Sequence, residues 1–194
     1  MNTKTKVFFA ASSDVSREKK QRYREIIYLL ENQGFATSQV IFRKKDFDLP
    51  SGKIDYTHIY ESVIEEINNS DLFIADISYP SGGVGYQVYH AFYQKKPIIV
   101  LFTENEKSNP SMIIRGIKSR KFFTLKYKNL EDLKKNLLPL IRKAKKQSKV
   151  RFQLVIDNKD YSFIETVANS LGISKTEYLK RLIRSAREKF LNER

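Results

Sequence analysis

The sequence predicts a protein of the α/β class, in which a parallel sheet lies between helices and a small C-terminal strand-helix-helix domain follows. Three observations lead to this prediction. Short apolar runs alternate with amphipathic stretches over the first 146 residues. The runs 72–77 and 97–102 are continuous and rich in Ile and Val, as in strands that are covered on both faces. The periodicity changes after Gln147, so we expect two domains, residues 1–146 and 147–194.

The first elements follow from apolar runs and helix-end signals. Residues 7–11 form an apolar run that predicts the first strand. The helix expected at 16–33 has apolar residues at helical spacing and is followed by Gly34, a residue common at helix ends. Residues 37–42 are expected to form the second strand. The segment 43–55 contains proline and glycine, which predicts an irregular loop.

Three further strands and three further helices are expected along the rest of the first domain. A helix is expected at 56–69, followed by the strand 72–77, a glycine-bearing turn at 78–85 and a helix at 86–94. The strand 97–102 leads to a fifth strand at 121–127 and a closing helix at 130–146. Five strands with crossover helices predict a flavodoxin-like or Rossmann-like three-layer domain.

The last 48 residues have a different pattern of apolar and polar residues. Apolar and polar residues alternate strictly over 151–156, and two helices are expected at 159–171 and 175–190. Ser174 and Glu177 form a capping box at the start of the second helix. So small a unit buries little surface, and a lone strand leaves its hydrogen-bonding edges open. We therefore expect a homodimer in which two chains pair their C-terminal strands.

Composition excludes several classes of function. The 194 residues contain no cysteine and two histidines, which excludes thiolate chemistry and cysteine-bound metals, so no metal or cofactor is expected. The longest apolar run has five residues, far short of the roughly 20 that cross a bilayer, and we expect a soluble, cytoplasmic protein with no membrane partner. The net charge of +14 arises mainly from residues 115–151, which carry +12. This predicts a basic face for polyanions; the alternative is a solvated lysine-rich helix.

The turn after the third strand is the strongest motif. Its glycines allow backbone amides to approach a ligand, and the helix that follows offers an anion site at its N-terminus. This block resembles the nucleoside 2-deoxyribosyltransferase superfamily, in particular its branch of deoxynucleoside-monophosphate and CMP N-glycosidases. The residues that carry the resemblance are Ser70, Asp71, Ile74 to Ser78, Pro80, Ser81, Gly83 to Tyr86, Ala91, Lys96 and Pro97.

The resemblance covers about residues 5–140 and implies a flavodoxin-like fold that binds a nucleoside or nucleotide. It places Ser81 against the 5′-phosphate, with Gly83 and Gly85 shaping the turn. Ser12 and Ser13 fall in the first ligand loop. Asp76 ends a strand and is expected to bind a ribose hydroxyl or to cap the following turn.

The nucleophilic glutamate of this family falls on Gln87, and a second family carboxylate falls on Val63. A carboxamide is a poor nucleophile, so the usual covalent reaction is in doubt. Three possibilities stay open: Glu61 or Asp76 reaches the sugar from nearby, Gln87 is an engineered replacement for glutamate, or Gln87 binds a sugar hydroxyl in a site that does not cleave.

The C-terminal pattern, over about residues 149–190, resembles a ribbon-helix-helix DNA-binding domain. That resemblance places Arg151, Gln153 and Val155 in the major groove of double-stranded DNA and Ser174 and Lys175 against a phosphate. The alternative is a dimerisation module without DNA contact.

Two functions follow. The first is a ligand-responsive DNA-binding regulator whose nucleotide-binding domain is catalytically weakened. The alternative is an active N-glycosidase or 2-deoxyribosyltransferase on nucleosides or their monophosphates, dimerised by its C-terminal module.

Overall fold

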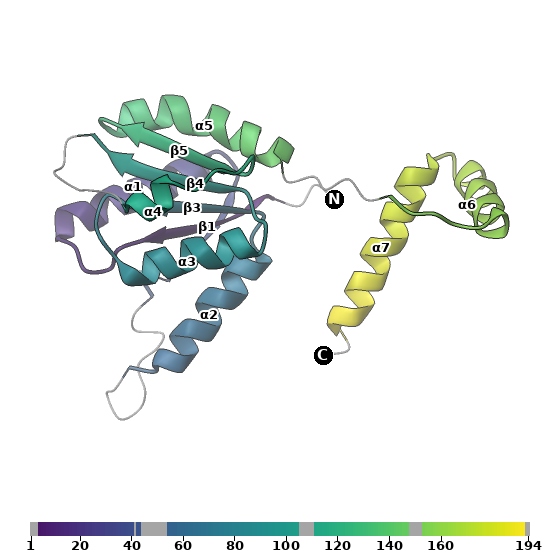
Figure 1. The fold of residues 1–194 in the computed structure, drawn as a ribbon, viewed down its shortest axis with the longest axis horizontal. Helices are drawn as coiled ribbons and strands as arrows, with labels where there is room; N and C mark the ends of the chain where they lie inside the picture. Colours follow the sequence, from purple (N-terminus) through teal and green to yellow (C-terminus); the bar gives the residue numbers. More distant parts are fainter. Residues whose placement is uncertain (1–3, 41, 44–53, 105–110, 148–152, 193–194) are drawn as a thin grey trace. The chain divides into compact units, whose positions relative to one another are not determined.

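A computed structural model describes residues 4–40, 42–43, 54–104, 111–147 and 153–192. The chain divides into two compact units, residues 1–150 and 151–194 (Figure 1). Among the described residues, no helix is long and apolar enough to cross a membrane. The same part of the chain contains no group of three or more His, Cys, Asp or Glu side chains that could hold a metal ion.

The first unit is built on five parallel strands in the order β2-β1-β3-β4-β5. The expected α/β fold with a five-stranded parallel sheet is confirmed. The strands are β1 (Lys6–Ala11), β2 (Ala36–Ser38), β3 (Leu72–Asp76), β4 (Ile98–Thr103) and β5 (Phe122–Tyr127). The helices are α1 (Arg17–Asn32), α2 (Tyr56–Asn69), α3 (Gly82–Tyr93), the short α4 (Met112–Arg115) and α5 (Leu130–Gln147).

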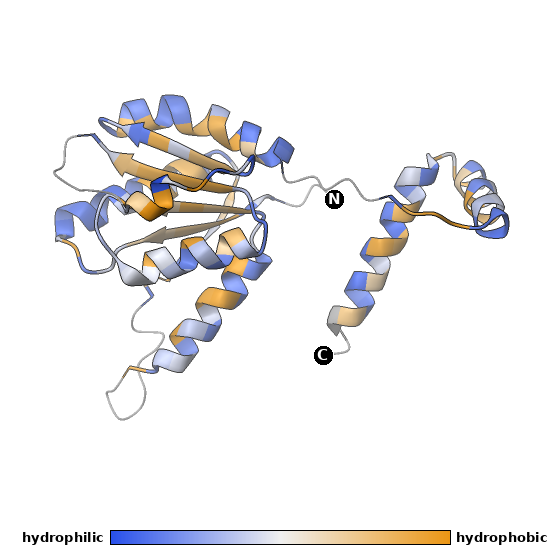
Figure 2. Ribbon diagram, viewed as in Figure 1, coloured by the Kyte–Doolittle hydropathy of each residue, from blue (hydrophilic) through white to orange (hydrophobic). Residues whose placement is uncertain are grey.

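Helices cover both faces of the sheet (Figure 1). On one face, α1 and α5 pack on alternate residues of β1 such as Val7 and Phe9, and on the other face α2 and α3 pack on Phe8 and Ala10. Because successive side chains of a strand point to opposite faces, the central strands must be apolar throughout. Figure 2 shows this as hydrophobic colour along the central strands.

Three elements of the first unit differ from the sequence-based expectation. Helix α3 begins four residues before the expected start, because Ser81 caps it and accepts a hydrogen bond from the backbone N–H of Val84 at 3.3 Å. Strand β2 is only three residues long, and the one-turn helix α4 was not expected.

The second unit contains α6 (Asn158–Ser170) and α7 (Lys175–Asn192). Ser174 accepts a hydrogen bond from the backbone N–H of Glu177 at 3.1 Å, as the capping box predicts. Residues 153–157 form no strand, contrary to expectation. A strand needs a neighbour for its backbone groups, and the described chain supplies none at this segment.

Candidate functional site

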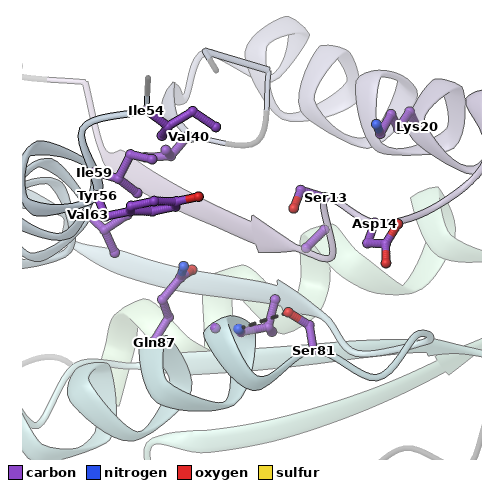
Figure 3. Close-up of a pocket in the computed structure, with 13 residues that line it drawn as sticks. Ser13, Asp14, Lys20, Val40, Ile54, Tyr56, Ile59, Val63, Ser81 and Gln87 are labelled. Carbon is purple, nitrogen blue, oxygen red and sulfur yellow. Dashed lines mark hydrogen bonds between the residues drawn. The ribbon is translucent and has the colours of Figure 1, made fainter. Parts of the chain in front are cut away.

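A cleft of about 580 Å³ lies beyond the carboxyl ends of β1 and β3. These strands end side by side, since Ala11 of β1 pairs with Asp76 of β3. Ligands of open parallel sheets bind at this edge, where the loops after neighbouring strands diverge. The cleft is open to solvent, and the loop after β1, α2 and α3 form its walls (Figure 3).

One wall is the start of α3. Ser81, Gly83, Val84 and Gln87 line the cleft there. The first backbone N–H groups of a helix have no intrahelical partner, and the helix dipole adds a partial positive charge. This wall can therefore bind an anion through backbone N–H groups and through the Ser81 hydroxyl, all of which can donate hydrogen bonds.

The opposite wall is the loop after β1 and the first turn of α1. It contributes Ser13, Asp14 and Lys20, which lie across the cleft from Ser81 (Figure 3). Asp14 is the one carboxylate, and Lys20 the one ammonium group, among the described residues that line the cleft. Neither was singled out in the sequence, because only the fold brings this loop to face α3. The available signal for these two residues was that their segment directly follows the first strand, where loops of such sheets bind ligands.

The other end of the cleft is apolar. Its lining is Val40, Ile54, Tyr56, Ile59 and Val63. Gln87 lies between the two ends, and its carboxamide points into the cleft toward the ring of Tyr56 (Figure 3). No hydrogen bond joins the Gln87 side chain to another described residue, so its amide is available to a ligand or a water molecule.

The cleft thus contains four of the residues expected from sequence: Ser13, Ser81, Gly83 and Gln87. Ser12, Asp76 and Gly85 are not part of its lining. Glu61, considered as a substitute carboxylate, does not line it either, and Val63 presents an apolar side chain where the resemblance places a carboxylate. The exposed Tyr86 and Tyr89 are also outside the lining.

Asp76 is fully buried behind the cleft. Its carboxylate accepts hydrogen bonds from the Tyr127 hydroxyl at 2.7 Å and from the backbone N–H of Ser78 at 2.9 Å. Burial raises the pKa of Asp76 above its usual value, and the two hydrogen bonds oppose this effect. The second hydrogen bond fixes the turn that leads to Ser81. Asp76 therefore helps to position a lining residue without lining the cleft itself.

The residues expected to contact DNA are placed as follows. Arg151 lies outside the described residues, and Gln153 and Val155 are exposed in the segment that forms no strand. Lys175 donates hydrogen bonds to Glu165 at 2.6 Å and to the Tyr161 hydroxyl at 2.7 Å, which raise its pKa. Its ammonium group is therefore already engaged within the unit.

No family model matches the chain. Among curated proteins, a 2′-deoxynucleoside 5′-phosphate N-hydrolase 1 of Syntrophotalea carbinolica is 30% identical over 128 residues, which are 66% of this chain and 88% of the relative. A protein of the same name from Methanococcoides burtonii is 31% identical and is matched over 57% of this chain and 89% of its own length. The 5-hydroxymethyl-dUMP N-hydrolase of Danio rerio is 26% identical, over 68% of this chain and 92% of that protein.

The fold also matches a solved structure. The CMP N-glycosidase of Clostridium botulinum has a TM-score of 0.53 at 23% identity, and the match covers 70% of this chain and 99% of that one.

These relatives correct one hypothesis. All are named as enzymes that act on nucleotides, so the primary prediction of a ligand-responsive DNA-binding regulator is wrong, and the enzymatic alternative is favoured. The matched regions cover most of the relatives' own length, from 88% to 99% in these three, and the regulator hypothesis depended on the C-terminal pattern instead.

Proposed function

This chain belongs to the 2′-deoxynucleoside 5′-phosphate N-hydrolase family, and from that premise we propose that it hydrolyses the N-glycosidic bond of 2′-deoxynucleoside 5′-monophosphates. One observation carries the proposal: the cleft has a polar end, an apolar end and a single amide side chain, Gln87, between them. A nucleotide has the same order of parts, with a phosphate, a sugar and a flat base.

The polar end suits the phosphate. Ser81 and the first amides of α3 supply hydrogen-bond donors, and Lys20 supplies a positive charge from the opposite wall (Figure 3). Lys20 forms no ion pair with another described residue, so its charge is not already neutralised.

The apolar end suits the base. The ring of Tyr56 offers a stacking surface, and Val40, Ile59 and Val63 surround it with aliphatic side chains. A base in this position places the bond between sugar and base close to Gln87, which lies between the two ends.

Hydrolysis then proceeds by direct attack of water. Gln87 carries no charge and does not form a glycosyl-enzyme, so we assign it to hold the sugar or the water through its amide. Asp14 takes a proton from the water while the oxygen of the water bonds to C1′. The bond from C1′ to the base nitrogen breaks, its electron pair leaves with the base, and solvent protonates the base. The products are a free base and 2-deoxyribose 5-phosphate.

The same reasoning disfavours base exchange. Transfer of the sugar to a second base requires an intermediate that survives departure of the first base, and this is normally a glycosyl-carboxylate. With Gln87 and Val63 at the two family carboxylate positions, hydrolysis is the reaction that these residues support better.

The second unit has a separate role in this proposal, as a dimerisation module of the ribbon-helix-helix type. Of its described side chains, only Ile164 and Ala168 belong to the buried core. Several large apolar side chains remain exposed, namely Leu154, Val155, Tyr161, Phe163, Leu171, Leu182, Ile183 and Phe190. A second copy that pairs with residues 153–156 would cover part of this surface and complete the missing strand contacts.

The assignment of Asp14 is tested by Asp14→Asn. Loss of a general base lowers a rate by roughly 100-fold to 10,000-fold, so turnover of deoxynucleoside monophosphates should fall by at least 100-fold. Glu131→Gln removes an exposed carboxylate of α5 and serves as the matched control. If Asp14→Asn retains the wild-type kcat, another group activates the water and the assignment is wrong.

A further inference from the structure

Lysine and arginine gather at the edge of the sheet opposite the cleft. The cleft lies beyond the carboxyl ends of the strands, and this edge contains the residues before β4 and β5 and the C-terminal end of α5. Its segments are 94–96, 117–121 and 142–147, and seven of their nine basic residues belong to the strongly basic stretch 115–151. We call the nine residues the basic edge; they are Lys95, Lys96, Lys118, Arg120, Lys121, Arg142, Lys143, Lys145 and Lys146.

Contacts between the three segments make the basic edge one surface. Strands β4 and β5 are neighbours, and the Lys121 ammonium group donates a hydrogen bond to the backbone carbonyl of Lys95 at 2.9 Å, which joins the residues before the two strands. Helix α5 packs on both strands, and its C-terminal end lies near the start of β5 (Figure 1). There the Lys143 ammonium group lies 5.7 Å from the ring centroid of Phe123, the second residue of β5.

The positive charge of the basic edge is not cancelled locally. The three segments contain no Asp or Glu. The Lys96 ammonium group donates hydrogen bonds to the backbone carbonyls of Asn68 at 2.7 Å and Ser70 at 2.6 Å, and these neutral acceptors leave its charge in place. Setting Lys145 aside, no member of the basic edge forms an ion pair with a carboxylate in the part of the chain that the structure describes.

The opposite ends of the same elements have no such excess of positive charge. Beyond the end of β4, Glu104 lies 3.0 Å from the ammonium group of Lys126 and 3.9 Å from that of Lys128. Helix α5 begins with the acidic residues Glu131 and Asp132. The charge is therefore polarised along the strands. Lysines in the last turn of a helix offset its dipole, but this accounts only for the end of α5 and not for the residues before β4 and β5.

These properties fit the backbone of a nucleic acid. Its phosphates attract clustered lysine and arginine, and contacts to phosphate require no readout of the bases. An anionic membrane also attracts basic residues, but proteins that lie on membranes add exposed apolar side chains to them. Among the described residues of the first unit, the exposed large apolar side chains belong to α1, α2, α3 and α4, and none belongs to the three segments of the basic edge.

We propose that the basic edge binds the phosphate backbone of nucleic acid without regard to base sequence. This contact is independent of the proposed hydrolysis, because the basic edge and the cleft lie at opposite ends of the strands. A chain bound in this way keeps its cleft open to solvent. The contact involves no response to a ligand and none of the C-terminal residues on which the regulator hypothesis depended.

The test follows the fluorescence anisotropy of a labelled DNA duplex of mixed sequence that is titrated with the full chain, at salt concentrations from about 50 to 200 mM. The edge variant is Lys118→Gln/Arg120→Gln/Arg142→Gln/Lys146→Gln. All four side chains are exposed, so the fold should persist, and circular dichroism checks this. No substrate is present, so the result does not depend on whether the cleft hydrolyses nucleotides.

The matched control is Arg17→Gln/Arg24→Gln/Lys134→Gln/Lys135→Gln. It removes the same number of charges from exposed positions of α1 and of the first half of α5, outside the basic edge. A difference between the two variants therefore reports the location of the charges and not the net charge of the chain.

We expect the wild type to bind the duplex with an affinity that falls steeply as salt rises. The edge variant should lose about tenfold or more in affinity, and the slope of log affinity against log salt should shrink by about 3 to 4, because each phosphate contact contributes about 0.9 to it. The control should keep the wild-type slope.

Three results would overturn the proposal. The wild type does not bind the duplex at about 50 mM salt, or the edge variant and the control lose affinity equally. In the third, the wild type sediments with vesicles of phosphatidylserine and phosphatidylcholine but does not bind the duplex, and the edge variant loses the vesicles, which assigns the basic edge to a membrane.

Discussion

The hydroxyl of Tyr127, at the end of β5, donates a 2.7 Å hydrogen bond to the carboxylate of Asp76, at the end of β3. Both side chains are buried, and β4 lies between their strands. The same carboxylate accepts a hydrogen bond from the backbone N–H of Ser78. This hydrogen bond holds the turn that leads to Ser81, which lines the cleft. The buried hydrogen bonds at the strand ends therefore help to fix the turn that leads to Ser81.

Removal of this hydrogen bond should destabilise the first unit. Tyr127→Phe removes one of the hydrogen bonds that the buried Asp76 carboxylate accepts, and an unsatisfied buried polar group costs about 1–3 kcal/mol. Urea unfolding measures the loss. Tyr28→Phe, at an exposed position, is the control and should change the unfolding free energy little. Equal stability of both variants would show that the hydrogen bond contributes nothing net.

Asp76 should also make stability depend on pH. Burial raises its pKa in the folded state above the usual 3.8, so the folded protein holds this proton more tightly than the unfolded chain. Its contribution is therefore complete below about pH 3.8 and is lost as the pH rises through the folded-state pKa. The stability difference between wild type and Asp76→Asn should decrease as the pH rises above 4. A difference that grows over this range would mean that hydrogen bonds, not burial, dominate.

Lys20 should set the preference for phosphorylated substrates. In Lys20→Ala, the KM for a deoxynucleoside monophosphate should rise by about tenfold, because a charge-assisted contact to phosphate contributes about 1–3 kcal/mol. The KM for the matching nucleoside should not change. Lys118→Ala, in an exposed segment, controls for the loss of net charge. A parallel rise in both KM values would place Lys20 away from the phosphate.

Gln87→Glu should return a carboxylate to the position where the family has its nucleophile. We expect faster base release and a covalent sugar-phosphate adduct that intact-protein mass spectrometry detects. Gln94→Glu, at the exposed C-terminal cap of the same helix, is the control. Unchanged rates and the absence of an adduct would show that position 87 does not face C1′.

The C-terminal contact is tested by neighbouring residues of opposite orientation in the expected strand. Leu154→Asp places a charge on the face that would pack on the helices, whereas Val155→Asp changes the outer face. Leu154→Asp should remove the association that the C-terminal units provide, which light scattering after size exclusion measures, and Val155→Asp should not. If both variants remain dimeric, the unit pairs in another way.

Much of the fold was predictable, because buried parallel strands and amphipathic helices leave clear patterns. The helix Tyr56–Asn69 has the bounds expected from sequence. The start of α3 was placed too late because Gly82, Gly83 and Gly85 read as a loop, whereas the Ser81 cap and packing of Val84 make this segment helical. The strand expected near 151–156 is absent from residues 153–157, for which the described part of the chain supplies no neighbouring strand.

The site was predicted only in part. Ser81 and Gln87 belong to a continuous motif, and the structure places both at the cleft. Asp14 and Lys20 have no motif of their own, and their relevance appears only when β1 and β3 bring two loops together. Asp76 was expected to bind a ribose hydroxyl or to cap the following turn, and its carboxylate accepts hydrogen bonds from the backbone N–H of Ser78 in that turn and from Tyr127.

The most direct test of the proposed hydrolysis is base release, measured by chromatography, from a panel of 2′-deoxynucleoside 5′-monophosphates and the corresponding nucleosides. We expect the chain as it stands to release free base from at least one monophosphate, faster than from its nucleoside, and Asp14→Asn to suppress the release. If no member of the panel loses its base, while Gln87→Glu is active on the same substrates, the cleft binds nucleotides without cleaving them and the proposed hydrolysis is contradicted.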